Sequence, residues 1–312
     1  MPLADDRLRH ALQDVLQRPV RSLARRAHPY GSSHTIEDVA VRFDDGPPLE
    51  LVFKDVLAPG AHADAAKPVR LRDPERELEA YRDVLGPAGL DVACCYGTFS
   101  EPGRRWLILE SVRGVPLWQV AEDAAWDEAA RWLARLHARP VPARSAHLLR
   151  YDEAALRVTL ERALALTPPG ALDGVAALWE RVVARLAAWP AGIVHGDYHP
   201  SNILVQHRER PTPRIRPVDW ELAGIGPGLL DLAALTSGSW SAAERERIAL
   251  AYARALPPAL RTPPADLLDA LAHCRLLLAV QWLGWSPDWS PPAAHAHDWL
   301  AEAAALAREL AP

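Results

Sequence analysis

The chain has 312 residues and a net charge of −5, and its 49% apolar and 24% charged residues are typical of a globular protein with one large domain or two ordinary ones. This charge provides no basic field for nucleic acid, and the apolar runs are too short to cross a bilayer, so we expect neither partner. The three cysteines form no disulfide framework and the charged N-terminus lacks a signal segment, which favours a cytoplasmic protein.

The first third of the chain is predicted to be rich in β-strands. A short amphipathic helix over residues 5–18 precedes it. Two strands on either side of the turn DDGPP should pair as an antiparallel hairpin, and a loop over 58–72 should then lead into a helix that Asp73 can cap. The expected strands are 37–43, 49–56, 91–99 and 105–110, and the expected helix is 74–85.

The remainder of the chain is predicted to be mainly helical. Only residues 203–205 and 215–220 interrupt it as strands, and they should form a second hairpin. Pro217 lacks a backbone N–H, so its strand should lie at a sheet edge or be bulged. The expected helices are 126–139, 152–166, 173–188, 241–255, 264–284 and 295–310.

A polar cluster between two apolar runs, IVHGDYHPSNILV at 193–205, is difficult to explain as packing alone. Asp197 and Asn202 have the D-x-x-x-x-N spacing of a kinase catalytic loop, in which Asp accepts a hydroxyl proton and Asn holds Mg²⁺. Asp219 and Glu221 follow at the end of the next predicted strand. Because Mg²⁺ prefers oxygen ligands, an amide and a carboxylate from neighbouring hairpin ends would suit it.

The β-rich part contributes a second set of candidates. Lys54 lies in a predicted strand and Glu77 in the helix that follows, and such a pair would position the α- and β-phosphates of ATP. The turn formed by Gly31, Ser32 and Ser33 could cover the phosphates with backbone N–H groups.

These motifs resemble the aminoglycoside phosphotransferase and choline kinase-like family of small-molecule kinases. The resemblance covers roughly residues 30–235. It is carried by HGDYHPSN (195–202) and VDWELAGIGPGLLDLA (218–233), with support from RELEAYRDVL (76–85), LESVRGVPL (109–117) and LARLHA (133–138). It implies an α+β, bilobal protein-kinase-like fold, with a nucleotide-binding lobe at 1–110 and a catalytic and acceptor-binding lobe at 111–312.

The resemblance also implies an ATP- and Mg²⁺-dependent phosphotransferase that phosphorylates a hydroxyl group of a small molecule, such as an antibiotic, a sugar or an amino alcohol. The implied roles are Asp197 as catalytic base, Asn202 and Asp219 as metal ligands, Lys54 as the phosphate contact with Glu77 as its partner, and Glu110 to Gly114 as the hinge that meets adenine. His195 should orient the loop by hydrogen bonding, and Asp231 should anchor the loop or a helix start.

Two other functions are possible from the sequence. A catalytically inactive nucleotide-binding module could keep the same fold, although the complete set of site residues argues against it. A protein kinase is disfavoured, because the chain has HGD and DWE where protein kinases have HRD and DFG, and it has no APE. The acceptor, the purine preference and the oligomeric state are not predicted.

The C-terminal tryptophans have two interpretations. Trp282, Trp285, Trp289 and Trp299 could pack helices, or they could wall an acceptor pocket with flat aromatic faces. A polycationic acceptor would need several acids there. The candidates are Asp288 and Asp298, and two acids are few for that purpose.

Overall fold

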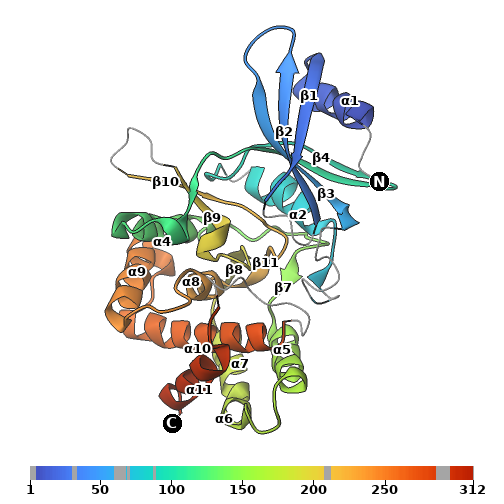
Figure 1. The fold of residues 1–312 in the computed structure, drawn as a ribbon. Coiled ribbons are helices and arrows are strands. Elements are labelled where there is room, and N and C mark those ends of the chain that lie inside the picture. The colour runs from blue at the N-terminus through green and yellow to red at the C-terminus, as the bar shows by residue number, and fades with distance from the viewer. Residues whose placement is uncertain are drawn as a thin grey trace.

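The computed structural model describes residues 5–29, 34–59, 68, 71–86, 89–206, 212–285 and 296–311. In these residues the chain forms two lobes, a small one built on an antiparallel sheet and a larger, mainly helical one beneath it (Figure 1). The expected bilobal α+β architecture is therefore confirmed.

Five strands form the sheet of the small lobe in the order β1-β2-β3-β5-β4, with antiparallel neighbours. The predicted hairpin is confirmed, since Val41 pairs with Leu49 across its two strands. The strands are β1 (Val20–Ala27), β2 (His34–Phe43), β3 (Leu49–Pro59), β4 (Cys95–Glu101) and β5 (Arg104–Glu110).

Strand β1 has no counterpart among the elements expected from the sequence, because its segment VRSLARRA alternates only weakly between buried and exposed positions. In the structure Arg25 pairs with Glu37 of β2 at 2.7 Å, and Arg26 pairs with Asp38 at 3.0 Å. Such cross-strand pairs support a strand that hydrophobic alternation alone does not predict.

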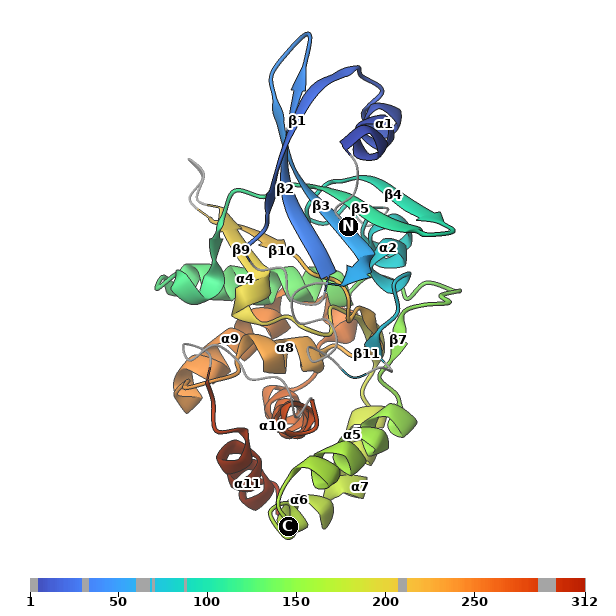
Figure 2. The ribbon, with the colours of Figure 1, turned by 45° about the vertical axis from the view of Figure 1, so that its right-hand side comes forward.

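Two helices cover opposite faces of this sheet. Along β5, Trp106 and Ile108 join the core under helix α1 (Asp5–Leu16), whereas Leu107 and Leu109 join the core that includes the helix after β3. That second helix is α-helical at Arg76–Glu79 (α2) and continues as a π-helical turn at Ala80–Leu85 (η2), shown beneath the sheet in Figure 2. It confirms the helix predicted over 74–85.

The large lobe contains most of the helices predicted from the sequence. The helix expected over 173–188 is instead two helices, because Leu178 leaves the helical backbone region between them. A short helix at Leu229–Leu235 (α8) was not expected. The others are α4 (Asp123–His137), α5 (Glu153–Leu166), α6 (Asp173–Ala176), α7 (Trp179–Ala187), α9 (Ala242–Ala255), α10 (Pro264–Leu283) and α11 (Trp299–Glu309).

The predicted second hairpin is confirmed by β9 (Ile203–Gln206) and β10 (Arg214–Pro217), which pair antiparallel. Pro217 is the last residue of β10, which lies at an edge of its sheet, as expected of proline. The expectation of no further strands in this lobe is wrong, because β6 pairs with β9 of the hairpin, and β7, β11 and β8 form a separate small sheet. These further strands are β6 (Val115–Pro116), β7 (Leu149–Arg150), β8 (Ala191–Val194) and β11 (Gly224–Pro227).

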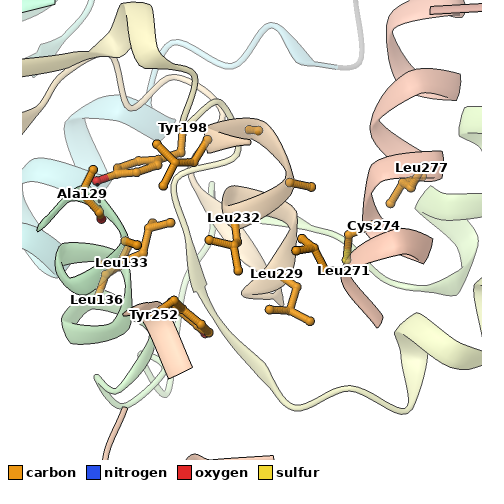
Figure 3. Packing of buried hydrophobic residues seen from close by; sticks show 14 of the residues in the cluster. Ala129, Leu133, Leu136, Tyr198, Leu229, Leu232, Tyr252, Leu271, Cys274 and Leu277 are labelled. Atoms are coloured by element: carbon orange, nitrogen blue, oxygen red, sulfur yellow. Dashed lines mark hydrogen bonds between the residues drawn. The ribbon is translucent and has the colours of Figure 1, made fainter. Parts of the chain in front are cut away.

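Helix α8 occupies the centre of the large lobe. Its Leu229 and Leu232 lie between Leu133 of α4 on one side and Leu271 of α10 on the other (Figure 3). Each such buried leucine contributes about 1.5–3 kcal/mol of hydrophobic stabilisation, so α8 is firmly held. In the part of the chain that the structure covers, no helix combines the length and the apolar character needed to span a bilayer.

Candidate active site

The small lobe contributes a buried ion pair to the space between the lobes. Lys54 on β3 and Glu77 on α2 approach to 2.5 Å between Nζ and Oε2, and their side chains are only 5% and 4% exposed. The pairing predicted from the sequence is therefore present. Strand β3 lies in the middle of the sheet and α2 lies directly beneath it, so both residues are fixed by well-packed elements.

The same lysine also reaches the large lobe. Lys54 Nζ donates a hydrogen bond of 2.9 Å to Asp219 Oδ1, although 165 residues separate them in the sequence. Asp219 follows β10 and has a positive φ of 65°, a conformation that costs energy for a non-glycine residue. The next residue, Trp220, donates its backbone N–H to Glu77 Oε1 at 3.2 Å. Glu77 therefore holds both the lysine and the Asp219 segment.

Electrostatics keep Lys54 charged. Burial lowers the pKa of Lys54, but the carboxylates of Asp219 and Glu77 outweigh it, so the pKa lies well above the usual value. Burial raises the pKa of Glu77, and Lys54 counteracts only part of that effect. The lysine is thus a permanent cation beside a partly exposed carboxylate.

The loop after β8 carries the second half of the site. Asn202 Nδ2 donates to Asp197 twice, to Oδ2 at 2.8 Å and to the backbone carbonyl at 3.0 Å. The backbone carbonyl of Asn202 accepts from Val218 N–H at 2.9 Å, one residue before Asp219. The three residues predicted from the two motifs are therefore brought together.

His195 orients this loop, as predicted. Its Nε2 lies 3.0 Å from the carbonyl of Val218, and its Nδ1 accepts the backbone N–H of Asp197 at 3.3 Å. These partners require a neutral ring with the proton on Nε2. Burial lowers the pKa of His195, with Asp231 only partly opposing it, which agrees with the neutral form.

Asp231 of α8 anchors the loop from below, also as predicted. Its carboxylate accepts the backbone N–H groups of His195 at 2.7 Å and Gly196 at 2.9 Å. His137 Nε2 lies 3.2 Å from the same carboxylate. Because α8 is central to the core, these contacts tie the position of Asp197 to the most rigid part of the lobe.

Gly196 is required by its surroundings. Its φ is +82°, and a Cβ there would lie 2.1 Å from the carbonyl oxygen of Leu222 and 2.4 Å from the hydroxyl of Tyr151. Tyr151 in turn donates to that carbonyl at 2.8 Å. A side chain at position 196 would push the loop away from the Asp219 segment. Nothing in the sequence around Tyr151 indicates that this residue packs against Gly196.

Two other parts of the expected nucleotide site are the phosphate-covering turn and the segment predicted to meet adenine. The turn of Gly31, Ser32 and Ser33 lies outside the described residues. Glu110 ends β5, but its carboxylate pairs with Arg216 and accepts the backbone N–H of Cys94 at 3.1 Å. The Glu110 side chain thus ties the hinge to β10, and only its backbone remains as a candidate contact for adenine.

Two residues that were not assigned a role hold the Asp219 segment. Arg76, 3% exposed, donates to the carbonyls of Leu71 at 2.7 Å, Glu221 at 2.9 Å and His147 at 3.0 Å. His34 Nε2 lies 3.4 Å from Glu221 Oε2. The only signal for Arg76 in the sequence is its place next to Glu77.

The C-terminal tryptophans gather beside the catalytic loop. Trp282 stacks on Trp299 at 5.8 Å and lies 5.3 Å from Trp285, as helix packing would require. Its ring is also 5.5 Å from that of His199, whose Nε2 lies 3.6 Å from Asp197 Oδ1. The cluster therefore packs helices and also reaches the loop, while Trp289 lies outside the described residues.

The donor set can be tested against a divalent cation. Among the described residues, no three His, Cys, Asp or Glu side chains lie close enough together to hold a metal. Asp219 supplies a carboxylate with 38% exposure, and Asn202, whose N–H₂ group binds Asp197, has its amide oxygen left to offer. Two oxygen ligands completed by phosphate and water suit Mg²⁺, which rarely occupies an all-protein cage.

Comparison with known proteins agrees with this geometry. The model of the phosphotransferase enzyme family matches residues 35–267, a stretch that includes Lys54, Asp197 and Asp219. No curated protein matches the chain by sequence.

Solved structures with the same fold include three kinases. Ethanolamine kinase from Plasmodium vivax superposes with a TM-score of 0.63 at 14% identity, covering 97% of this chain and 86% of that one. Choline kinase LicA from Streptococcus pneumoniae gives 0.60 at 15% identity, with 97% of each chain covered. The streptomycin–ATP–APH(2″)-IIa ternary complex gives 0.56 at 13% identity, covering 99% of this chain and 97% of that one. At these identities the likeness shows the fold, which is the expected kinase-like one.

Proposed function

Because the chain belongs to the phosphotransferase enzyme family, we propose that it transfers the terminal phosphoryl group of ATP, with Mg²⁺, to a hydroxyl group of a small molecule. The observation that carries the proposal is the 2.9 Å contact between Lys54 and Asp219. The contact joins a permanent cation to the carboxylate that we propose as a metal ligand, next to the loop with Asp197 and Asn202. A nucleotide that used Lys54 would thus bring its phosphates to that loop.

Asp197 is the residue proposed to act on the acceptor. It would accept a hydrogen bond from the acceptor hydroxyl, orient its oxygen toward the phosphorus and take the proton as the new bond forms. Asn202 holds Oδ2 of this carboxylate and the backbone of the loop, so the group is already oriented. Most of the rate enhancement would come from such positioning, because phosphoryl transfer needs little covalent help from protein groups.

Lys54 is proposed to contact the nucleotide phosphates, with Glu77 holding its ammonium group in place. Asn202 and Asp219 would hold Mg²⁺. When bound, the cation would neutralise charge on the phosphate oxygens. Adenine would meet the backbone of Glu110 to Gly114, since the Glu110 side chain is engaged with Arg216. Gly31, Ser32 and Ser33 remain candidates for covering the phosphates.

The acceptor is proposed to be a small alcohol with an apolar or aromatic-compatible surface. Trp282 lies against His199, next to Asp197, so an acceptor at Asp197 would meet aromatic faces. Of the two candidate acids for a polycation, Asp298 caps α11 by accepting from Ala301 N–H at 2.9 Å, and Asp288 lies outside the described residues. Relatives of this fold include kinases named for ethanolamine, choline and aminopropanol, which supports testing amino alcohols together with sugars and macrolides.

The test is a coupled assay of ADP release over these acceptor classes, with aminoglycosides included. For an acceptor that supports turnover, Asp197→Asn should lower kcat by roughly 10²-fold or more, the range for a positioned general base. Binding of MgATP, measured by calorimetry, should stay near the wild-type value. Asp44→Asn, an exposed change in the β2–β3 turn, is the matched control and should leave both quantities unchanged.

Two results would contradict the proposal. Full turnover by Asp197→Asn would remove this residue from its assigned role. A wild-type protein that binds no ATP with or without Mg²⁺ would contradict nucleotide use altogether, whereas MgATP binding without turnover on any acceptor class would favour an inactive nucleotide-binding module.

A further inference from the structure

Three consecutive residues, Asp219–Glu221, are held from the small lobe by four separate side chains. The contacts are Lys54 to the Asp219 carboxylate, Glu77 to the Trp220 N–H, Arg76 to the Glu221 carbonyl and His34 to the Glu221 carboxylate. These side chains come from β2, β3 and α2. The short segment is therefore one point at which these small-lobe elements contact the large lobe, and His147, bonded to Arg76 and Glu79 of α2, is another.

The contact between His34 and Glu221 differs from the other three. His34 is the first residue of β2, and its Nε2 lies 3.4 Å from Glu221 Oε2, with the two side chains 19% and 16% exposed. Arg76, on α2 of the small lobe, donates to the backbone carbonyl of Glu221 in the large lobe. Glu221 is thus held at both its carbonyl and its carboxylate, and neither contact uses Lys54 or Asp219.

The His34–Glu221 contact is made by other atoms than the Lys54–Asp219 contact, although the charge of Glu221 also helps to raise the pKa of Lys54. Under the proposed function, Lys54 and Asp219 would turn to phosphate and cation when a nucleotide enters, so their direct contact would be remade. Asp219 also keeps a left-handed backbone, which costs of order 1–3 kcal/mol and persists only if its surroundings enforce it. If the His34–Glu221 contact stays in place while a nucleotide enters, it would hold the two lobes in the same relative position and keep the Asp219 backbone in its left-handed conformation.

We propose that His34 is a positioning residue for nucleotide binding, acting through Glu221 to hold β2 against the segment that carries Asp219. The proposal rests on the proposed function, because it concerns the same nucleotide site. The imidazole would donate its Nε2–H to the Glu221 carboxylate, a contact that tightens as the lobes close on a ligand.

The experiment compares steady-state kinetics of His34→Ala, His34→Gln and the wild-type enzyme with an acceptor that supports turnover. His34→Ala should raise KM for MgATP roughly threefold to tenfold, as expected for one partly exposed, charge-assisted contact, with kcat within about twofold. His34→Gln should recover most of the affinity, because its amide N–H can still donate to Glu221. The melting temperature of His34→Ala should stay close to that of the wild type, so that unfolding does not account for the rise in KM for MgATP.

Two further variants make the test specific. His28→Ala is the matched control, because His28 follows β1 in the small lobe and its ring faces Asp38 of the same lobe at 3.9 Å, so KM should not change. In the Glu221→Ala background, His34→Ala should have no additional effect if the two residues act through one contact.

Failure of this inference can be told apart from failure of the proposed function. An unchanged KM in His34→Ala, or independent effects of His34→Ala and Glu221→Ala, overturns the role of His34 in an enzyme that still uses ATP. A wild-type protein without ATP-dependent turnover overturns the proposed function, and the role of His34 with it.

Discussion

Replacing Lys54 by Met should destabilise the protein more than a typical substitution, apart from any effect on activity. The change removes the only partner within 3 Å that the structure records for the buried Glu77 Oε2 oxygen. Breaking a buried ion pair by deleting one member costs about 3–5 kcal/mol, because an uncompensated charge remains inside the protein. Asp219 also loses its partner, but its carboxylate is partly exposed and can be hydrated.

The loss of stability caused by Lys54→Met should be larger at high pH than at low pH. Burial already raises the pKa of Glu77, and without Lys54 it should rise further. A carboxyl group whose pKa is higher in the folded than in the unfolded state binds more protons when folded, so stability falls as pH rises from its unfolded value through its folded value. The cost of Lys54→Met should therefore be at least about 1 kcal/mol smaller near pH 5.5 than near pH 8, since one pKa unit corresponds to about 1.4 kcal/mol.

The assay is urea denaturation of both proteins at the two pH values. Lys54→Met/Glu77→Gln should be more stable than Lys54→Met alone at the higher pH, because the neutral amide can stay buried and still accept from Trp220 N–H. Arg82→Met, which breaks an exposed pair on η2, serves as control and should cost less than about 0.5 kcal/mol. A pH-independent cost equal to that of the control would refute the reasoning.

Three further predictions concern the catalytic loop. Asp231→Asn should cost about 2–4 kcal/mol in urea denaturation, because one of the two buried N–H groups of His195 and Gly196 would face an amide N–H₂. Gly196→Ala should lower kcat by more than 10²-fold, with a loss of melting temperature, since a Cβ there overlaps neighbouring atoms. Asn202→Ala should raise the Mg²⁺ concentration for half-maximal turnover at least about tenfold, and it should also free the Asp197 carboxylate.

The first two of these predictions have control variants elsewhere in the large lobe. Asp269→Asn on the exposed side of α10 should cost less than about 0.5 kcal/mol, and a similar value for Asp231→Asn would contradict its anchoring role. Gly174→Ala on α6, where a Cβ meets nothing within 4 Å, should keep full activity, in contrast to Gly196→Ala. An unchanged Mg²⁺ dependence in Asn202→Ala would exclude this amide as a ligand.

The sequence predicts those parts of the fold and site in which one periodicity or one spacing is decisive. The hairpin of β2 and β3 and the helix α4 follow from clear apolar patterns. The spacing of Asp197 and Asn202 is local, so a motif can reveal it. The pairing of Lys54 with Glu77 was accessible because consecutive elements usually pack together.

The parts that could not be predicted depend on contacts between distant segments. Strand β1 is stabilised by ion pairs rather than by alternation. The short strands β7, β8 and β11 have only two to four residues each, too few for a period to appear. Arg76 acts through carbonyl groups, which every residue has, so no residue type marks its targets. Glu110 shows the opposite case, since its position at the end of β5 was predictable and the direction of its side chain was not.

The inner face of α2 and η2 belongs to the same hydrophobic cluster as the helices of the large lobe, whereas the face of the sheet beneath α1 forms a separate cluster. A chimera that exchanged halves with a relative at the end of β5 would therefore set Leu78 and Tyr81 against a foreign surface. A chimera that folds should therefore take α2 and η2 from the same parent as the large lobe. In the intact chain, the same shared interior should make both halves melt in a single cooperative step.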